Sequence, residues 1–226
     1  MKCKSLPLLI VLTLTCLLSF TFPLMAAATS YFNGGINSLA NNGADLTIET
    51  QNPYVSSGSS VSAWPMTCDG NVVGDYAQVG WLKLSSYTGP YYFYEYSYIP
   101  TGAHYQRVLG SATVGSNNDF RVGCDSSTMY FIINNTTYGT VALSTIPFDR
   151  NTVEFLGETH SASDQCPGSV SNPVTMGKAQ YKSTSNSWYN TYAINQDSLG
   201  YGDLSTMRNN IVSGGSYTFE IWDSRY

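Results

Sequence analysis

Apolar and polar residues alternate along much of the chain, in short runs rich in Tyr, Val, Phe, Ile and Thr. Gly, Ser, Asn and Thr interrupt the runs at short intervals, and long helical periodicity is absent. A period of two is typical of strands that bury one face. The pattern predicts strands at residues 44–50, 59–66, 76–84, 91–98, 105–114, 119–124, 129–135, 139–143, 152–158, 174–181, 188–194 and 216–222.

Many short strands joined by turns predict an all-β protein, organised as an antiparallel sandwich of two sheets. Residues 203–210 (DLSTMRNN) are expected to form a short helical turn. The sequence contains no internal repeat and no linker long enough to separate two domains. We therefore expect residues 29–226 to form one β-sandwich domain.

The N-terminal residues 1–28 have the composition of a secretory signal. Lys2 and Lys4 precede an apolar run at residues 6–25, and three alanines at residues 26–28 supply the small residues that a signal peptidase requires. The run is almost long enough for an uncleaved membrane anchor, but the small residues and the polar chain that follow favour cleavage. The prediction is a secreted, extracellular protein with no membrane association after signal cleavage.

Charge limits the choice of partner. The signal carries two of the ten basic residues, so the mature chain has eight Lys and Arg against fifteen Asp and Glu. Binding to nucleic acid needs clustered basic side chains that this sequence lacks, and we expect no nucleic-acid partner. An excess of carboxylates is compatible with activity at low pH, where fewer of them are charged.

The cysteines and histidines do not form a metal-binding pattern. Cys68, Cys124 and Cys166 remain in the mature chain, and an odd number permits at most one internal disulfide, whose pairing the sequence leaves open. His104 and His160 stand far apart without a C-x-x-C motif nearby, so we predict no structural metal and no cofactor.

The stretch VEFLGETH (153–160) concentrates ionisable groups in a chain of which only 11% is charged. In a strand, Val153 and Phe155 point to one side, and Glu154, Glu158 and His160 point to the other. One face is therefore apolar, and the opposite face carries the groups that can exchange protons.

Two further strands carry polar side chains on one face. Gln78 shares a face with Gly80 and lies opposite Ala77 and Val79, and a glycine in a strand suggests that another group approaches closely there. Glu95 lies among aromatic residues in YYFYEYSYIP. A carboxylate in such surroundings has a raised pKa or accepts hydrogen bonds, for example from a tyrosine hydroxyl.

The order of motifs resembles that of the glutamic peptidases, or eqolisins, which are secreted acid proteases built on a two-sheet sandwich. The similar stretches cover almost the whole mature chain and are FNGGI (32–36), ADLTIETQNPYVSSGSSVSAW (44–64), DGN (69–71), AQVGW (77–81), FYEYSYIP (93–100) and VEFLGE (153–158). Residues 157–181 are more similar to the related neprosin-type peptidases, whose motif has Glu at the position of Gln78.

The resemblance implies a concanavalin A-like, jelly-roll-type sandwich that acts as a monomeric endopeptidase on polypeptide substrates in acid. It places the catalytic pair on Gln78 and Glu158, with Glu158 as general base and the Gln78 amide stabilising the oxyanion. It assigns substrate-contacting or supporting roles to Trp64, Asp69, Glu95 and Tyr96. Glu154 is expected to lie beside Glu158, and His160 near the rim of the cleft.

Other functions fit parts of the pattern. An aromatic sandwich face is also used by carbohydrate- or peptide-binding modules, and Glu95 with Glu158 is a possible acid and base pair for a glycosidase. Glu158, His160 and Asp164 form a possible but unusually spaced metal site. The sequence also departs from the eqolisin pattern around Glu158, where Gly157 precedes it and Thr159 and His160 follow it.

Overall fold

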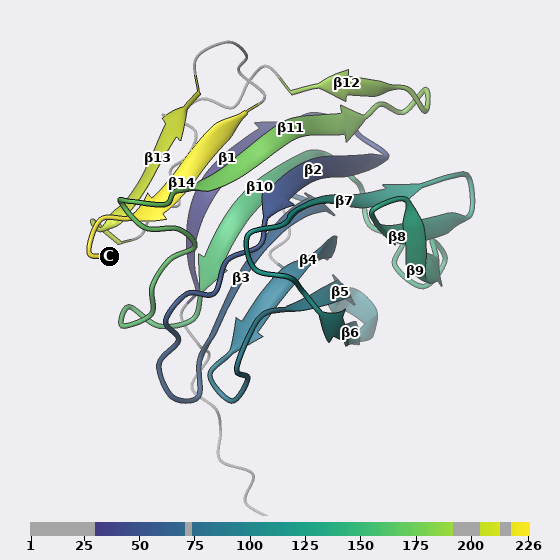
Figure 1. Cartoon of the computed structure of the whole chain (residues 1–226). Helices are drawn as coiled ribbons and strands as arrows, with labels where there is room; N and C mark the ends of the chain where they lie inside the picture. The colour runs from purple at the N-terminus through teal and green to yellow at the C-terminus, as the bar shows by residue number, and fades with distance from the viewer. Residues whose placement is uncertain (1–29, 71–73, 192–203, 213–217) are drawn as a thin grey trace, which may run out of the picture.

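The computed structural model describes residues 30–70, 74–191, 204–212 and 218–226 and contains two antiparallel sheets packed face to face (Figure 1). The predicted fold class, an all-β antiparallel two-sheet sandwich, is confirmed. The predicted signal at residues 1–28 lies outside the described residues. Within the described ranges, no helix is long and apolar enough to cross a membrane.

The first sheet has six strands in the order β1-β10-β3-β4-β5-β6, and all of its pairings are antiparallel. Strands distant in sequence are neighbours here, since β10 lies between β1 and β3. A 3-10 turn at Ile99–Thr101 connects β5 to β6. The strands are β1 (Tyr31–Ser38), β3 (Ser60–Cys68), β4 (Tyr76–Leu84), β5 (Tyr91–Tyr98), β6 (Ala103–Ser111) and β10 (Thr152–Thr159).

The second sheet follows the order β13-β14-β11-β2-β7-β8-β9, with β12 paired to β11 outside this path. Figure 1 shows β13 and β14 side by side at one edge, near the C-terminus, and β8 and β9 at the opposite edge. Its strands are β2 (Gly43–Glu49), β7 (Asn117–Cys124), β8 (Thr128–Ile133), β9 (Thr136–Ala142), β11 (Val174–Lys182), β12 (Trp188–Asn190), β13 (Met207–Ile211) and β14 (Phe219–Asp223).

The hydrophobic core fills the space between the sheets. The six-stranded sheet contributes one face of each central strand, including Val79 and Trp81 from β4 and Phe155 from β10. The eight-stranded sheet contributes residues such as Leu46 and Phe120, and all five side chains are fully buried. Because alternate residues enter this core, the residues between them point to the outer face of each sheet.

One predicted segment differs in the structure, and parts of two others lie outside the described residues. The helical turn predicted at 203–210 is correct only in part. The Met207 N–H donates to the Leu204 carbonyl at 2.9 Å and closes a turn, whereas Met207–Ile211 forms the edge strand β13, which pairs with β14 along its whole length. Residue 203 lies outside the described residues. Backbone pairing with an existing sheet edge outweighs the local preference of an Asn-rich segment for turns. Residues 192–194 and 216–217 of the predicted strands 188–194 and 216–222 lie outside the described residues.

The strand β1 was not among the predicted strands, because Asn33, Gly34 and Gly35 are poor strand formers. Its backbone pairs with β10 from Tyr31 to Ser38. At Gly34, where φ is +152°, a Cβ atom would stand 2.1 Å from the Phe155 carbonyl oxygen, so this close approach requires glycine.

The three cysteines among the described residues, Cys68, Cys124 and Cys166, are all buried and free. None of them forms a disulfide in this structure.

Candidate functional site

A cavity of about 510 Å³ lies on the outer face of the six-stranded sheet, and we call it the groove. The alternation inferred from the sequence explains its lining. Along β10, Val153 and Phe155 enter the core whereas Glu154 and Glu158 face the groove, as predicted. The side chains that line the groove include Phe32, Trp64, Gln78, Glu95, Glu154 and Glu158.

Backbone register arranges the polar residues in rows that cross the sheet. Glu154 pairs with Met66 of β3, and Met66 pairs with Gln78 of β4. The same row continues through Glu95 of β5 to Gln106 of β6. The backbones of Glu154 and Gln78 are therefore two strand spacings apart, a distance of roughly 10 Å.

Glu158 belongs to a different row. It pairs with Ser62 of β3, which pairs with Leu82 of β4. Four residues along β10 separate Glu158 from Glu154, so the backbones of Glu158 and Gln78 are roughly 16 Å apart.

An apolar cluster lines the groove between these two rows and extends to Leu82 in the row of Glu158. It consists of Trp64, Leu82, Phe93 and Leu156, all almost fully buried, with Phe32 and Met66 among the residues packed against it. The Phe32 ring meets the Trp64 ring edge-on at a centroid distance of 6.3 Å. This cluster gives the groove an apolar centre with carboxylates on either side.

Glu95 accepts four hydrogen bonds, which satisfy both of its carboxylate oxygens. Oε1 accepts from the Tyr76 hydroxyl at 2.7 Å and contacts His104 Nε2 at 2.8 Å. Oε2 accepts from Gln78 Nε2 at 3.1 Å and from Gln106 Nε2 at 2.9 Å. Hydrogen bonding, with a tyrosine hydroxyl among the donors, was one of the two alternatives that the sequence left open for Glu95.

Glu158 lies among hydrogen-bond donors at the other end of the groove. Its Oε2 accepts from the Trp64 indole N–H at 3.2 Å and from the Ser62 hydroxyl at 3.4 Å. Its Oε1 lies 3.3 Å from His160 Nε2, and His160 Nδ1 in turn lies 3.3 Å from the Ser30 hydroxyl. His160 lies at the rim of the groove, as predicted, with 32% of its side chain exposed.

Glu154 is a groove carboxyl group whose surroundings raise its pKa. Burial is the main cause, a hydrogen bond from the Cys68 thiol lowers the pKa and the negative charge of Glu158 raises it, and together they bring the pKa to about 7. The Cys68 sulfur lies 3.6 Å from Glu154 Oε1. A carboxyl group with this pKa exchanges protons near neutral pH.

Of the remaining residues predicted for the site, Asp69 lines the groove and Tyr96 does not. Asp69 lines the groove and accepts a hydrogen bond from Asn151 Nδ2 at 3.0 Å. The structure does not bring Tyr96 to the groove, because its ring faces the opposite side of β5 and stacks on Tyr105 and Phe131.

Sequence reasoning did not assign roles to Ser62, Cys68, Tyr76, His104 and Gln106, which contact the groove carboxylates. For two of these residues the sequence does contain a signal. Alternation along β6 puts His104 and Gln106 on the same face of the strand. Their contact with Glu95 depends on the register between β5 and β6.

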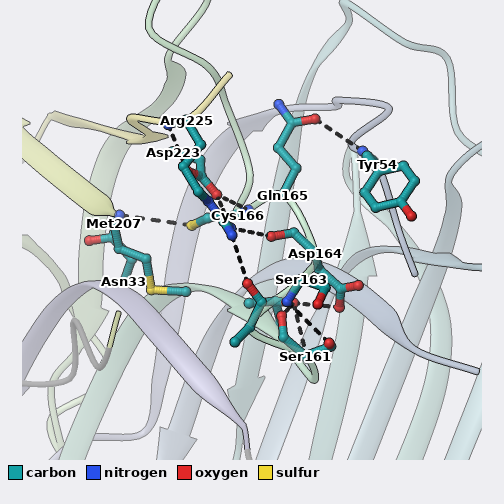
Figure 2. A network of polar contacts seen from close by, with 12 residues as sticks. Asn33, Tyr54, Ser161, Ser163, Asp164, Gln165, Cys166, Met207, Asp223 and Arg225 are labelled. Carbon is teal, nitrogen blue, oxygen red and sulfur yellow. Dashed lines mark hydrogen bonds and ion pairs between the residues drawn. The ribbon is translucent and has the colours of Figure 1, made fainter. Parts of the chain in front are cut away.

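The segment after β10 is held by a network of polar contacts (Figure 2). The buried Asp164 carboxylate accepts hydrogen bonds from the Ser56 amide and hydroxyl, the Ser59 hydroxyl and the Thr159 hydroxyl. Arg225, paired with buried Asp223, donates to the Ala162 and Asp164 carbonyls. The network fixes the end of β10 immediately after Glu158.

Carboxylates dominate the charge of the groove, and no Lys or Arg from the described part of the chain lines it. Within the same part of the chain, no group of three His, Cys, Asp or Glu side chains is arranged to hold a metal ion. The Asp164 carboxylate, one of the suggested metal ligands, instead accepts from Ser and Thr hydroxyls.

The fold and the groove define a two-sheet β-sandwich with carboxylates on the outer face of one sheet. No protein-family model and no curated protein matches the sequence. Among solved structures, the chain is similar to scytalido-glutamic peptidase bound to a peptide-based transition-state analogue, with a TM-score of 0.57 and 14% identity over 86% of this chain and 98% of that chain.

It is also similar to SCP-B, a member of the eqolisin family of peptidases in complex with the tripeptide Ala-Ile-His. The TM-score is 0.55 at 14% identity, again over 86% of this chain and 98% of that chain. These likenesses support the expected concanavalin A-like architecture of the sandwich.

Proposed function

We propose that this protein is a secreted peptide hydrolase of the glutamic type, which cleaves polypeptides in the groove. The observation that carries the proposal is the row that presents Glu154 and Gln78 to one cavity, two strands apart. A carboxylate and a primary amide are sufficient for the two tasks of amide hydrolysis, which are activation of water and stabilisation of an oxyanion. The similarity in fold to two peptidases is consistent with this function.

In the proposed reaction, a glutamate of β10 takes a proton from water while the water oxygen attacks the scissile carbonyl carbon. A side-chain N–H of Gln78 donates a hydrogen bond to the oxyanion that forms. The protonated glutamate then returns the proton to the leaving nitrogen as the C–N bond breaks.

The register favours Glu154 as this base. Glu154 shares a row with Gln78, whereas Glu158, the base predicted from the sequence, lies four residues further along β10. A base and an oxyanion donor must act on adjacent atoms of one peptide bond, which favours the closer pair. We therefore give Glu154 the role of base and Glu158 a supporting role at the Trp64 end of the groove.

Two partly exposed side chains of the groove, Phe32 and Met66, support a substrate that carries an apolar side chain near the scissile bond. They pack against the buried residues Trp64, Leu156 and Phe93, which form the floor of the groove. The neprosin-like stretch ending in VTMGKAQY contributes β11 to the other sheet, so the proposed chemistry rests on the eqolisin-like motifs.

The two other functions considered from the sequence receive less support from this geometry. Glu95 accepts hydrogen bonds from four donors, which occupy both of its carboxylate oxygens and leave neither free to act as the acid or base of a glycosidase. The groove rings of Trp64 and Phe93 are 2% and 1% exposed, which leaves little area for stacking a sugar.

Digestion of a denatured protein by the purified chain, across pH 3 to 8, tests the proposal. We expect Glu154→Gln to lower kcat by about 10³-fold and Gln78→Ala by about 10²-fold, in proteins that remain folded. Glu49→Gln on the other sheet is the matched control and should keep full activity. No cleavage by a folded wild-type protein at any pH would rule out the peptidase function.

A further inference from the structure

Gln78 needs a defined orientation to act as a donor. A glutamine amide presents N–H donors on one side and an acceptor oxygen on the other, and a rotation of half a turn exchanges them. An ionised carboxylate only accepts hydrogen bonds. Because Glu95 Oε2 lies 3.1 Å from Gln78 Nε2, Glu95 selects the orientation in which the nitrogen faces β5.

This selection works only while Glu95 is itself held in place. Tyr76 of β4 holds Oε1, and two residues of β6 supply the other donors besides Gln78. Gln106 holds the same oxygen that Gln78 contacts, whereas His104 holds the opposite oxygen. The groups that face Glu95 from both neighbouring strands are thus Tyr76, Gln78, His104 and Gln106.

We propose that His104 and Gln106 are positioning residues, which act through Glu95 to fix the orientation of the Gln78 amide. Neither residue was assigned a role from the sequence motifs. Both lie on β6, the edge strand of the sheet, and the His104 side chain is 58% exposed. The backbone pairing of β6 with β5 does not depend on these side chains. Their loss is therefore expected to free the amide without unfolding the sheet.

The catalytic consequence rests on the proposed peptidase function, but the orientation of the amide can be measured without it. The side-chain N–H resonances of Gln78 in a ¹⁵N-labelled protein report this directly, and their absence in Gln78→Glu identifies them. We expect Gln106→Leu and His104→Leu each to shift these resonances and to accelerate their exchange with water several-fold. Gln51→Leu is the matched control, because Gln51 also donates to a glutamate, Glu49, but on the other sheet.

If the chain hydrolyses peptides, Gln106→Leu should lower kcat by about tenfold with KM unchanged, since a misoriented amide weakens only oxyanion binding. Gln106→His restores a donor and should recover most of that loss. Altered Gln78 resonances without any hydrolysis by the wild type would support the positioning role while ruling out the peptidase. Unchanged Gln78 resonances in both Leu variants would overturn the inference.

Discussion

Glu154 of β10 and Gln78 of β4 face the groove from one row of the six-stranded sheet, with Met66 of β3 between them. The row arises because β10, distant in sequence from β3 and β4, is inserted beside β3. The two side chains are therefore brought together by sheet topology, although 76 residues separate them along the chain.

The pH dependence of hydrolysis should identify the base. A general base acts only when deprotonated, and burial raises the pKa of Glu154 to about 7. With Glu154 as base, kcat/KM should rise about tenfold per pH unit below pH 7 and level off above it. The opposite outcome is maximal activity in acid, kept in Glu154→Gln and lost in Glu158→Gln. It would identify Glu158 as the general base, as the sequence predicted.

The Cys68 thiol should influence the pH at which kcat/KM rises. Its hydrogen bond to Glu154 stabilises the ionised carboxylate and so lowers the pKa of that group. Removing it in Cys68→Ala should move the rise in kcat/KM to higher pH by about half a unit, the effect of a weak hydrogen bond. Cys124→Ala, at a buried thiol in the sandwich core, should lower stability and leave the midpoint of the profile in place.

Stability should also depend on the protonation of Glu154. Its folded-state pKa of about 7 lies above the ordinary value of 4.5, so the folded protein binds the proton more tightly than the unfolded chain. This contribution is fully present below pH 4.5 and is lost as the pH rises through 7, at a cost of about 3 kcal/mol.

Urea denaturation at pH 4.5 and pH 8 measures this dependence. Glu154→Gln should unfold with a free energy that changes less between these two pH values than in the wild type. An equal change in both proteins would show that other groups cause the pH dependence.

The local pattern was sufficient to predict most of the strands and the direction of their side chains. The strands β4 and β5 coincide with their predicted bounds, and Gln78, Glu95, Glu154 and Glu158 face away from the core as alternation requires. Alternation is a property of each strand, so a single sequence contains enough information to read it.

The arrangement between strands was not available from the same pattern. Which glutamate lies opposite Gln78 depends on the register of β10 against β3 and of β3 against β4, and a shift of one residue would reverse every side chain. The position of Tyr96 is a different case, because alternation along β5 already places its ring on the face opposite Glu95, and only the motif resemblance had assigned it to the site. The strand β1 was missed because tertiary pairing overrides its glycines.

Asp164 should be important for stability, since its buried carboxylate accepts four hydrogen bonds. An asparagine offers one acceptor oxygen and presents an N–H₂ group to hydroxyls that are arranged to donate. We expect Asp164→Asn to lower the free energy of unfolding by about 3 kcal/mol and Ser59→Ala by about 1 kcal/mol. Equal urea midpoints for Asp164→Asn and the wild type would contradict this role.

Gly80 connects the packing of β4 with the position of Trp64. A Cβ atom at residue 80 would stand 2.1 Å from the Ala63 carbonyl oxygen and 2.9 Å from Trp64 Cβ, so the close approach suggested by a glycine in this strand is present.

Gly80→Ala should therefore force β3 and β4 apart and lower the free energy of unfolding by about 2 kcal/mol. Displacement of Trp64 would also lengthen its hydrogen bond to Glu158, now 3.2 Å, and quench or shift the tryptophan fluorescence of the native state. Gly89→Ala, where a Cβ would meet nothing within 4 Å, is the matched control and should leave both the unfolding midpoint and the fluorescence unchanged. If both variants behaved alike, the contact between Gly80 and Trp64 would not be what constrains this part of the groove.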